Sequence, residues 1–441
     1  MLHLDDAHQQ AEKILEEFLE DKSRNWRILL IKDVFAKLHI VLWCPKKNRE
    51  SSREEIAQSL REASLAYWSE NVLYGQEKNE PPNGPWQDAA WHKARDVDGV
   101  NGLRVLERHR AKTGWFESPD EPPWTIKKKN GVPICLFYSF KGGVGRSTAL
   151  AATALHLATE GNRVVVLDAD LDAPGVGSLL TGYDSATASW GIVDYLLEYP
   201  ILAENGGLDI GDYYHLCPSE LVPGSGEILV FPVGAFDARY LDKLARLDYG
   251  VPPDHTEHPF VSLLKQINRD LAPDWILVDA RAGLGDVSGF LTGGLCHFHV
   301  LFGTLAGASW RGMRQIVDRL GGTRVREGKP QAECLVAAAM IPRSQEAQYQ
   351  ESVEWFTDQA RDVFSSHYYA EAEYQDNFWT MDDMESTDAP HVPIVLPYDE
   401  RLALFRNLSE VNSILLSPNG PYGELVEHLK AGSSRLKETT K

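Results

Sequence analysis

The stretch "ICLFYSFKGGVGRST", residues 134–148, contains the strand, loop and helix start that decide the fold. Residues 134–140 form an apolar run typical of a buried strand, and "KGGVG" predicts a loop. The helix that follows is expected to end at the pair Gly161–Asn162. This order directs backbone N–H groups and a helix N-terminus towards one point, which suits a bound phosphate. A tight glycine turn without a ligand is the plainer alternative.

Strand and helix patterns alternate along the chain after this loop. Near-continuous apolar strands separated by helices indicate a parallel sheet that is covered on both faces. We therefore expect an α/β fold, a doubly wound and mostly parallel sheet, with its ligand crevice at the carboxyl ends of the strands. The further strands are expected at Arg163–Asp168, Ile228–Val233, Trp275–Asp279, Phe298–Phe302, Cys334–Met340 and Val392–Leu396.

Acidic residues stand at the ends of two of these strands. Asp168 and Asp170 occur in "VVVLDADLDAPGVG", and Asp279 ends "WILVD". A magnesium–nucleotide complex needs carboxylate or hydroxyl ligands near the metal and a group that orients the attacking water. Strand-end carboxylates open onto the expected crevice, so they suit these roles. A solvated acidic turn is the alternative, and for Asp172 it is the better interpretation.

The loop departs from the common phosphate-binding pattern at two positions, with Phe140 in place of glycine and Arg146 in place of lysine. This form resembles the deviant Walker A loop of the MinD/ParA group of P-loop ATPases, within the SIMIBI class, and looks like its KGGVGR-motif variant. "VVVLDADLDAPGVG" resembles the switch I of that family, and "PDWILVDARAGLGD" resembles its Walker B and switch II. "VLPYDERLALF" resembles a Pro-containing segment near the end of the domain, so the resemblance covers roughly residues 132–415.

The resemblance implies ATP and Mg²⁺ as ligands and gives a role to each motif residue. Phosphate contacts would come from Gly142, Gly143, Val144, Gly145, Arg146, Ser147 and Thr148. Magnesium would be held by Ser147, Asp168 and Asp279, while Asp170 would orient the water and Gly283 would sense the γ-phosphate. Arg281 is either a charge stabiliser beside the phosphates or a partner for Asp286.

Lys141 resembles the signature lysine of the family, which implies that it contacts the nucleotide of a second subunit. ATP would then hold a homodimer together, and hydrolysis would release it. A solvated loop lysine is the alternative. Arg146 can neutralise phosphate oxygens, but its planar fork is broader than a lysine ammonium. Two functions therefore stay open: a slowly hydrolysing ATPase switch that signals to a protein partner, and a nucleotide-binding interaction module without useful hydrolysis.

The segments outside the motifs are an N-terminal module, a linker, an insertion and a C-terminal tail. Residues 1–117 predict a small α+β module of open role, with a helix at 1–22, a strand pair at 26–45 and a second helix at 52–73. The proline-rich residues 118–131 predict a linker. Residues 181–272 form a long insertion that is expected to carry the dimer or partner surface, and the N-terminal module is the other candidate for contact with a protein partner. Residues 416–441 predict a C-terminal helix and tail.

The composition limits the classes of partner. The formal net charge of −20 disfavours nucleic acid and anionic membrane surfaces. The longest apolar run, near residues 298–308, is too short to span a membrane. The five cysteines form no CxxC motif and predict buried, reduced thiols, and His297 and His299 are expected to be core residues. We therefore expect a soluble, cytoplasmic protein.

Overall fold

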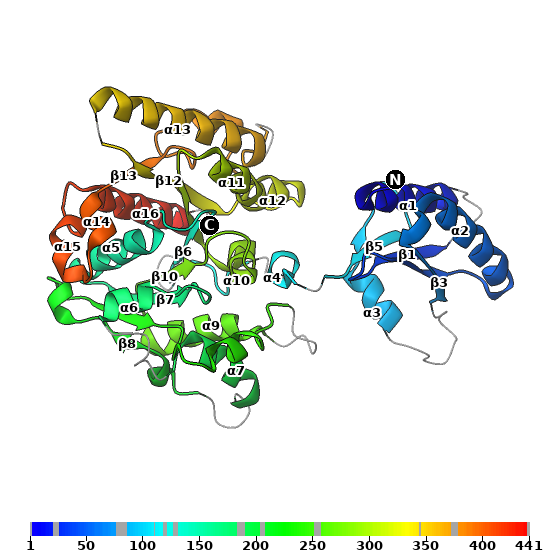
Figure 1. Cartoon of the computed structure of the whole chain (residues 1–441), viewed down its shortest axis with the longest axis horizontal. Helices are drawn as coiled ribbons and strands as arrows, with labels where there is room; N and C mark the ends of the chain where they lie inside the picture. Colours follow the sequence, from blue (N-terminus) through cyan, green and yellow to red (C-terminus); the bar gives the residue numbers. More distant parts are fainter. Residues whose placement is uncertain are drawn as a thin grey trace. The chain divides into compact units, whose positions relative to one another are not determined.

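The computed structural model describes residues 2–20, 26–75, 86–109, 111–117, 121–126, 131–182, 190–202, 208–250, 257–343, 345–371 and 378–438. The chain forms two compact units, Met1–Ala111 and Lys112–Lys441 (Figure 1). The boundary falls before Glu117, where the N-terminal module was expected to end. The reason is the short helix α4 (Thr113–Phe116), which packs against α10 (Asp286–Phe290) of the second unit.

The N-terminal unit is built on a five-stranded sheet with the order β3-β2-β1-β5-β4. Its elements are α1 (Leu4–Leu19), β1 (Arg27–Lys32), β2 (Leu38–Trp43), α2 (Arg49–Ser64), β3 (Trp68–Tyr74), α3 (Trp86–Lys93), β4 (Arg95–Asp96) and β5 (Leu103–Glu107). β1 pairs antiparallel with β2 and parallel with β5. Helices α1 and α2 pack on one face of the sheet, and Trp91 of α3 packs on the other.

The second helix of this unit is shorter than the sequence predicts. The expected helix at 52–73 ends at Ser64, because Leu65 takes a positive φ of 48°, and the chain continues as strand β3. The apolar residues Trp68 and Val72 are four positions apart, a spacing that fits one face of a helix as well as one face of a strand. The segment forms a strand because it pairs with β2, with Trp68 opposite Leu38 and Val72 opposite Ile40.

The second unit contains an eight-stranded sheet with the order β13-β12-β11-β6-β10-β7-β9-β8. All neighbouring strands are parallel except β8, which pairs antiparallel with β9 at the edge. The doubly wound, mostly parallel α/β fold is thereby confirmed. The strands are β6 (Ile134–Ser139), β7 (Arg163–Ala169), β8 (His215–Leu216), β9 (Glu227–Phe231), β10 (Trp275–Ala280), β11 (Phe298–Gly303), β12 (Glu333–Ile341) and β13 (Ile394–Pro397).

Helices cover both faces of this sheet and enclose two apolar cores (Figure 1). One face packs against α5 (Arg146–Thr159), α6 (Val176–Thr181), α15 (Leu408–Leu415) and α16 (Pro421–Glu438). The other packs against α7 (Ile192–Leu202), α9 (Pro259–Leu271), α10, α11 (Gly307–Leu320) and α13 (Glu346–His367). Shorter helices are α8 (Tyr240–Leu244), α12 (Gly322–Arg326) and α14 (Glu400–Leu404).

His297 fixes the start of the central strand β6. Its Nδ1 accepts the N–H of Ile134 at 3.1 Å, so its Nε2 carries the proton and donates to the carbonyl of Trp124 at 2.7 Å. Trp124 lies in the expected linker, and His297 is 8% exposed. Burial lowers the pKa of His297 to about 4, since a charged imidazole would lose water and its acceptor role together.

This histidine should make the protein less stable in mild acid. Its pKa is lower in the folded chain than in the unfolded chain, so the unfolded chain binds more protons below pH 6.5 and stability falls towards pH 4. The lowered pKa of His297 reduces the free energy of unfolding by up to about 3 kcal/mol as the pH falls to 4. Urea unfolding of wild type and His297→Gln between pH 7.5 and 4.5 should show a shallower pH slope in the variant. Parallel slopes would contradict the assignment.

Candidate nucleotide-binding site

The Gly-rich loop joins β6 to α5 in a conformation that requires glycine. Gly143 and Gly145 have positive φ angles of 73° and 81°, and Gly145 is the N-cap of α5. A Cβ built on Gly142, Gly143 or Gly145 would have no atom within 4 Å. The loop therefore has open space along its glycines, in front of the N-terminus of a long helix, as phosphate binding requires.

The strand-end carboxylates lie together beside this loop. β10 stands between β6 and β7 in the sheet, and Asp279 and Asp168 are register partners on neighbouring strands. Asp170 follows the end of β7. The Ser147 hydroxyl, in the first turn of α5, donates to Asp279 at 2.6 Å. The structure thus brings the first-turn serine and the three carboxylates to one edge of the sheet.

Arg146 points into this group of carboxylates. Its Nε lies 2.5 Å from Asp279 Oδ1, and one terminal nitrogen lies 3.0 Å from Asp170 Oδ2. The side chain is buried, which lowers the pKa of the guanidinium, but the charges of Asp279 and Asp170 outweigh burial and raise it. The sequence suggested that Arg146 reaches phosphate oxygens. In the structure it is the cation partner of two residues expected to serve the metal and the water.

Asp168 is bound on one side and unsatisfied on the other. Its Oδ2 accepts the backbone N–H groups of Gly175 at 3.0 Å and Gly177 at 2.9 Å. Its Oδ1 is buried without a hydrogen-bond partner among the described residues. Burial, followed by the charge of Asp279, raises the pKa of Asp168 to about 7. A buried carboxylate oxygen without a partner, next to Asp279 and Ser147, fits a small oxygen-seeking cation such as Mg²⁺.

The segment after β10 is held by several bonds. The N–H of Gly283 donates to the carbonyl of Ser139 at 3.0 Å, and the Tyr138 hydroxyl donates to the carbonyl of Gly283 at 3.1 Å. Arg281 lies 2.5 Å from Asp172, so the expected alternative partner Asp286 is not the residue it binds. This exposed ion pair links the two loops that follow β7 and β10.

Lys141 is placed differently from the other residues of the loop. Its side chain is exposed, and its ammonium lies 5.6 Å from the centroid of the Phe140 ring. Arg146 and Ser147, in the first turn of α5, contact the carboxylates. The structure therefore brings Arg146 and Ser147 into the carboxylate group and leaves Lys141 outside it.

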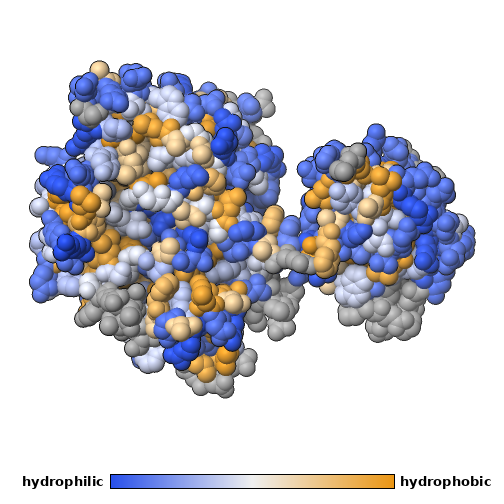
Figure 2. Space-filling model, viewed as in Figure 1, coloured by the Kyte–Doolittle hydropathy of each residue, from blue (hydrophilic) through white to orange (hydrophobic). Residues whose placement is uncertain are grey.

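A cavity of about 210 Å³ adjoins the glycine loop. Gly143, Gly145 and Thr148 line it together with Pro397, Tyr398 and Leu402, among others. Met340 also lines it and has a positive φ of 62° at a bulge between β12 and β13. Strained backbone of this kind tends to occur at functional sites. Figure 2 shows apolar residues on the surface over α14, which contributes Leu402 to the lining of the cavity.

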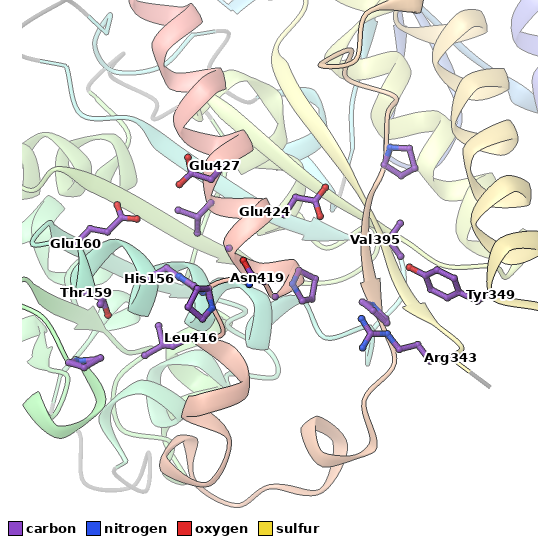
Figure 3. Close-up of a pocket in the computed structure, with 18 residues that line it drawn as sticks. His156, Thr159, Glu160, Arg343, Tyr349, Val395, Leu416, Asn419, Glu424 and Glu427 are labelled. Atoms are coloured by element: carbon purple, nitrogen blue, oxygen red, sulfur yellow. The ribbon is translucent and has the colours of Figure 1, made fainter. Parts of the chain in front are cut away.

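A larger cleft of about 940 Å³ shares Pro397 with this cavity but contains none of the loop glycines in its lining. Figure 3 shows Glu160, which follows the end of α5, and Glu427 of α16 on one side, with Arg343 and Tyr349 on the other. Glu160 and Glu427 are both bound by Lys430, at 2.6 and 2.9 Å. The larger volume therefore does not mark the nucleotide site, because neither the loop glycines nor the carboxylates at the strand ends line it.

The chain is similar to known proteins in the part that carries the loop. Residues 132–197 match the family described as "ParA: NUBPL iron-transfer P-loop NTPase". An iron–sulfur cluster carrier protein of Pseudomonas fragi is 38% identical over 87 residues, which span 19% of this chain and 27% of that protein. The cell division ATPase MinD of Pyrococcus furiosus matches at 18% identity over 68% of this chain and 99% of its own, with a TM-score of 0.40. A ParA family ATPase of Chlorobium tepidum matches at 16% identity over 67% and 97%, with a TM-score of 0.41.

These matches differ in what they establish. The TM-scores of the two solved structures are too low to carry an argument, so the fold assignment rests on the strand order of the second unit. Within the described residues, no helix has both the length and the apolar character needed to cross a membrane. The segment with the glycine loop is similar in sequence to the ParA/MinD-like P-loop NTPases, and nucleotide binding is the property which that likeness supports.

Proposed function

We propose that the second unit is an ATP-binding, Mg²⁺-dependent switch of the MinD/ParA type, in the KGGVGR form, that hydrolyses slowly and signals to a protein partner. The observation that carries the proposal is the open glycine loop at the N-terminus of α5, beside Asp168, Asp279 and Ser147. This combination supplies backbone donors for phosphates and oxygen ligands for a metal within one crevice.

Each side of the site has a distinct task in this proposal. The backbone from Gly142 to Gly145 would bind the phosphates, while Ser147, Asp168 and Asp279 would hold the metal. When bound, Mg²⁺ would neutralise charge on the phosphate oxygens. Asp170 orients the attacking water once Arg146 has left it. Gly283 turns its N–H from Ser139 towards the terminal phosphate, so the loop after β10 changes with the nucleotide.

The smaller cavity is the proposed site of the adenine base. It lies directly beside the loop glycines, and Pro397, Tyr398 and Leu402 provide apolar and aromatic surface against which a flat ring can pack. Met340, in its strained conformation, faces the same cavity.

The proposed dimer and partner surfaces involve residues outside the crevice. Lys141 is exposed and serves the nucleotide of the second subunit. The insertion has exposed apolar side chains at Trp190, Phe236 and Leu241, with 50%, 48% and 76% of their surface accessible. Ile192 donates its N–H to Pro232, so the segments around Trp190 and Phe236 meet just beyond the carboxyl end of β9. Apolar groups at this edge suit a protein interface.

We do not extend the role of the iron–sulfur cluster carrier to this chain. Cluster ligands are thiolates, which must be accessible and deprotonated. Cys44, Cys135, Cys296 and Cys334 are buried, and burial raises the pKa of the last three well above its usual value. Cys217 is half-buried and its pKa is raised to about 12. The thiols therefore lack the properties of cluster ligands.

A nucleotide-binding interaction module without useful hydrolysis is the second candidate. The observation in its favour is Arg146, which engages both Asp170 and Asp279 in a buried position. If the guanidinium keeps Asp170, no group orients the water. Phosphate release by wild type and by Asp170→Ala distinguishes the two candidate functions. Equal rates would exclude the hydrolysing switch and leave the nucleotide-binding module.

Binding of a fluorescent ATP analogue tests the proposed site. We expect a micromolar dissociation constant with Mg²⁺, and Ser147→Ala should weaken it about tenfold because one metal ligand is lost. In EDTA the wild type and the variant should bind equally, since Ser147 acts through the metal. Failure of wild type to bind at millimolar nucleotide, or an equal loss in EDTA, would contradict the assignment.

A further inference from the structure

We propose that Lys112 and Trp115 are positioning residues for the loop that contains Gly283 and that they connect this loop to the N-terminal unit. The inference rests on the proposed function, in which Gly283 senses the terminal phosphate. The N-terminal unit ends at Ala111, so Lys112 is the first residue of the second unit. We call the segment from Gly283 to Gly285 the sensing loop. The covalent connection between the units thus begins at a residue, Lys112, that contacts the sensing loop.

The two side chains bind consecutive carbonyl groups of that loop. Lys112 Nζ donates to the carbonyl of Leu284 at 2.6 Å, and Trp115 Nε1 donates to the carbonyl of Gly285 at 2.8 Å. These carbonyls directly follow Gly283, whose N–H is directed to Ser139. In the proposal, the loop moves as a unit when Gly283 turns towards a phosphate, so the carbonyls of Leu284 and Gly285 shift with it. This movement strains or breaks the bonds made by Lys112 and Trp115.

Helices α4 and α10 pack closely against each other. A Cβ on Gly114 would lie 2.2 Å from the carbonyl oxygen of Asp286, and a Cβ on Gly289 would lie 2.5 Å from the Trp115 ring. Arg319 of α11 donates to the carbonyl of Trp115 at 2.6 Å and to that of Gly289 at 3.1 Å. Its guanidinium also lies 5.2 Å from the centre of the Trp115 ring. α4 is therefore fixed against α10 and cannot follow the loop freely.

These bonds favour one state of the loop. They stabilise the arrangement in which the N–H of Gly283 faces Ser139 rather than a phosphate. Nucleotide binding must work against them, and by linkage a partner that pulls the segment away from α10 would help nucleotide bind. Loss of the indole donor should therefore tighten nucleotide binding about fivefold, the equivalent of one ordinary hydrogen bond.

The test uses the full chain, with Trp115→Phe and the matched control Trp124→Phe. Each variant keeps a ring and loses one indole hydrogen bond, but Trp124 donates to Val132 and not to the sensing loop. Hydrogen exchange of the peptide 112–117 is measured with and without Mg²⁺ and a non-hydrolysable ATP analogue. Affinity for a fluorescent ATP analogue is measured alongside.

In wild type and Trp124→Phe, we expect the nucleotide to speed exchange in residues 112–117. In Trp115→Phe, exchange should be fast without nucleotide, and the analogue should bind about fivefold more tightly than to either other protein. Wild type that binds nucleotide without any change in the exchange of 112–117 would overturn the inference and leave the proposed function standing. Wild type that binds no nucleotide would overturn both.

Discussion

In a buffer that contains EDTA, Arg146→Met is expected to lower the free energy of unfolding by about 3–5 kcal/mol, because a buried ion pair loses one partner. Asp279 is fully buried and Asp170 is nearly so, and Arg146 is the cation that both contact. Methionine keeps much of the apolar stem of arginine. The loss of stability therefore comes mainly from the missing charge and not from a cavity. Urea unfolding followed by circular dichroism measures the difference.

Magnesium without nucleotide should restore part of this stability in the variant. Asp279, Ser147 and the unsatisfied Oδ1 of Asp168 are oxygen ligands of the kind Mg²⁺ prefers. A concentration one hundred times the dissociation constant would return about 2.7 kcal/mol. Wild type should gain little, because the guanidinium of Arg146 already occupies Asp279, one of these ligands, and neighbouring Asp170.

The control for this experiment is Arg281→Met. Arg281 also pairs with an aspartate, Asp172 of the loop after β7, but its side chain is 38% exposed and that of Asp172 is 53% exposed. Solvent screens such a pair, so its removal should cost less than about 1 kcal/mol, and magnesium should have no effect. Equal losses in the two variants, or an equal gain from magnesium in wild type, would show that Arg146 does not stand in for a metal cation.

The central strands β6, β7, β10 and β11 of the second unit were predictable because they are buried on both faces. Residues 164–168 and 275–279 are continuous apolar runs that end in aspartate, a pattern that no amphipathic helix shares. The two-residue strand β8 was not predictable, since a short edge strand has no period of its own. β3 was predicted as a helix because the spacing of Trp68 and Val72 fits both structures, and only pairing with β2 distinguishes them.

The sequence predicted which residues lie in the site. It did not predict which of them contact one another. Asp168 and Asp279 could be placed together because parallel neighbouring strands end at the same edge of a sheet. The direction of the Arg146 side chain depends on the charges around it in three dimensions, which no spacing reveals. The bond between Trp115 and Gly285 joins residues 170 positions apart, so the sequence contained no sign of it.

Lys141→Ala is expected to slow phosphate release by about 10³-fold, the lower end of the effect of a cation supplied in trans. The affinity of the variant for a fluorescent ATP analogue should stay near that of wild type, because the exposed ammonium does not contact the carboxylates of its own site. Sizing with Mg²⁺ and ATP should show a dimer for wild type and a monomer-shifted equilibrium for the variant. A wild-type monomer in every condition would exclude the dimer mechanism.

A mixture of two inactive variants distinguishes a lysine that acts across the dimer from one that acts within its own subunit. Asp170→Ala removes the proposed water-orienting group but keeps Lys141, whereas Lys141→Ala keeps an otherwise complete site. In a mixed dimer, the site of the Lys141→Ala subunit receives its cation from the Asp170→Ala subunit. Random pairing at equal concentrations then restores about a quarter of wild-type phosphate release, since about half the dimers are mixed and each has one complete site. If Lys141 serves its own subunit, no mixed dimer contains a complete site, and the mixture stays as inactive as its components.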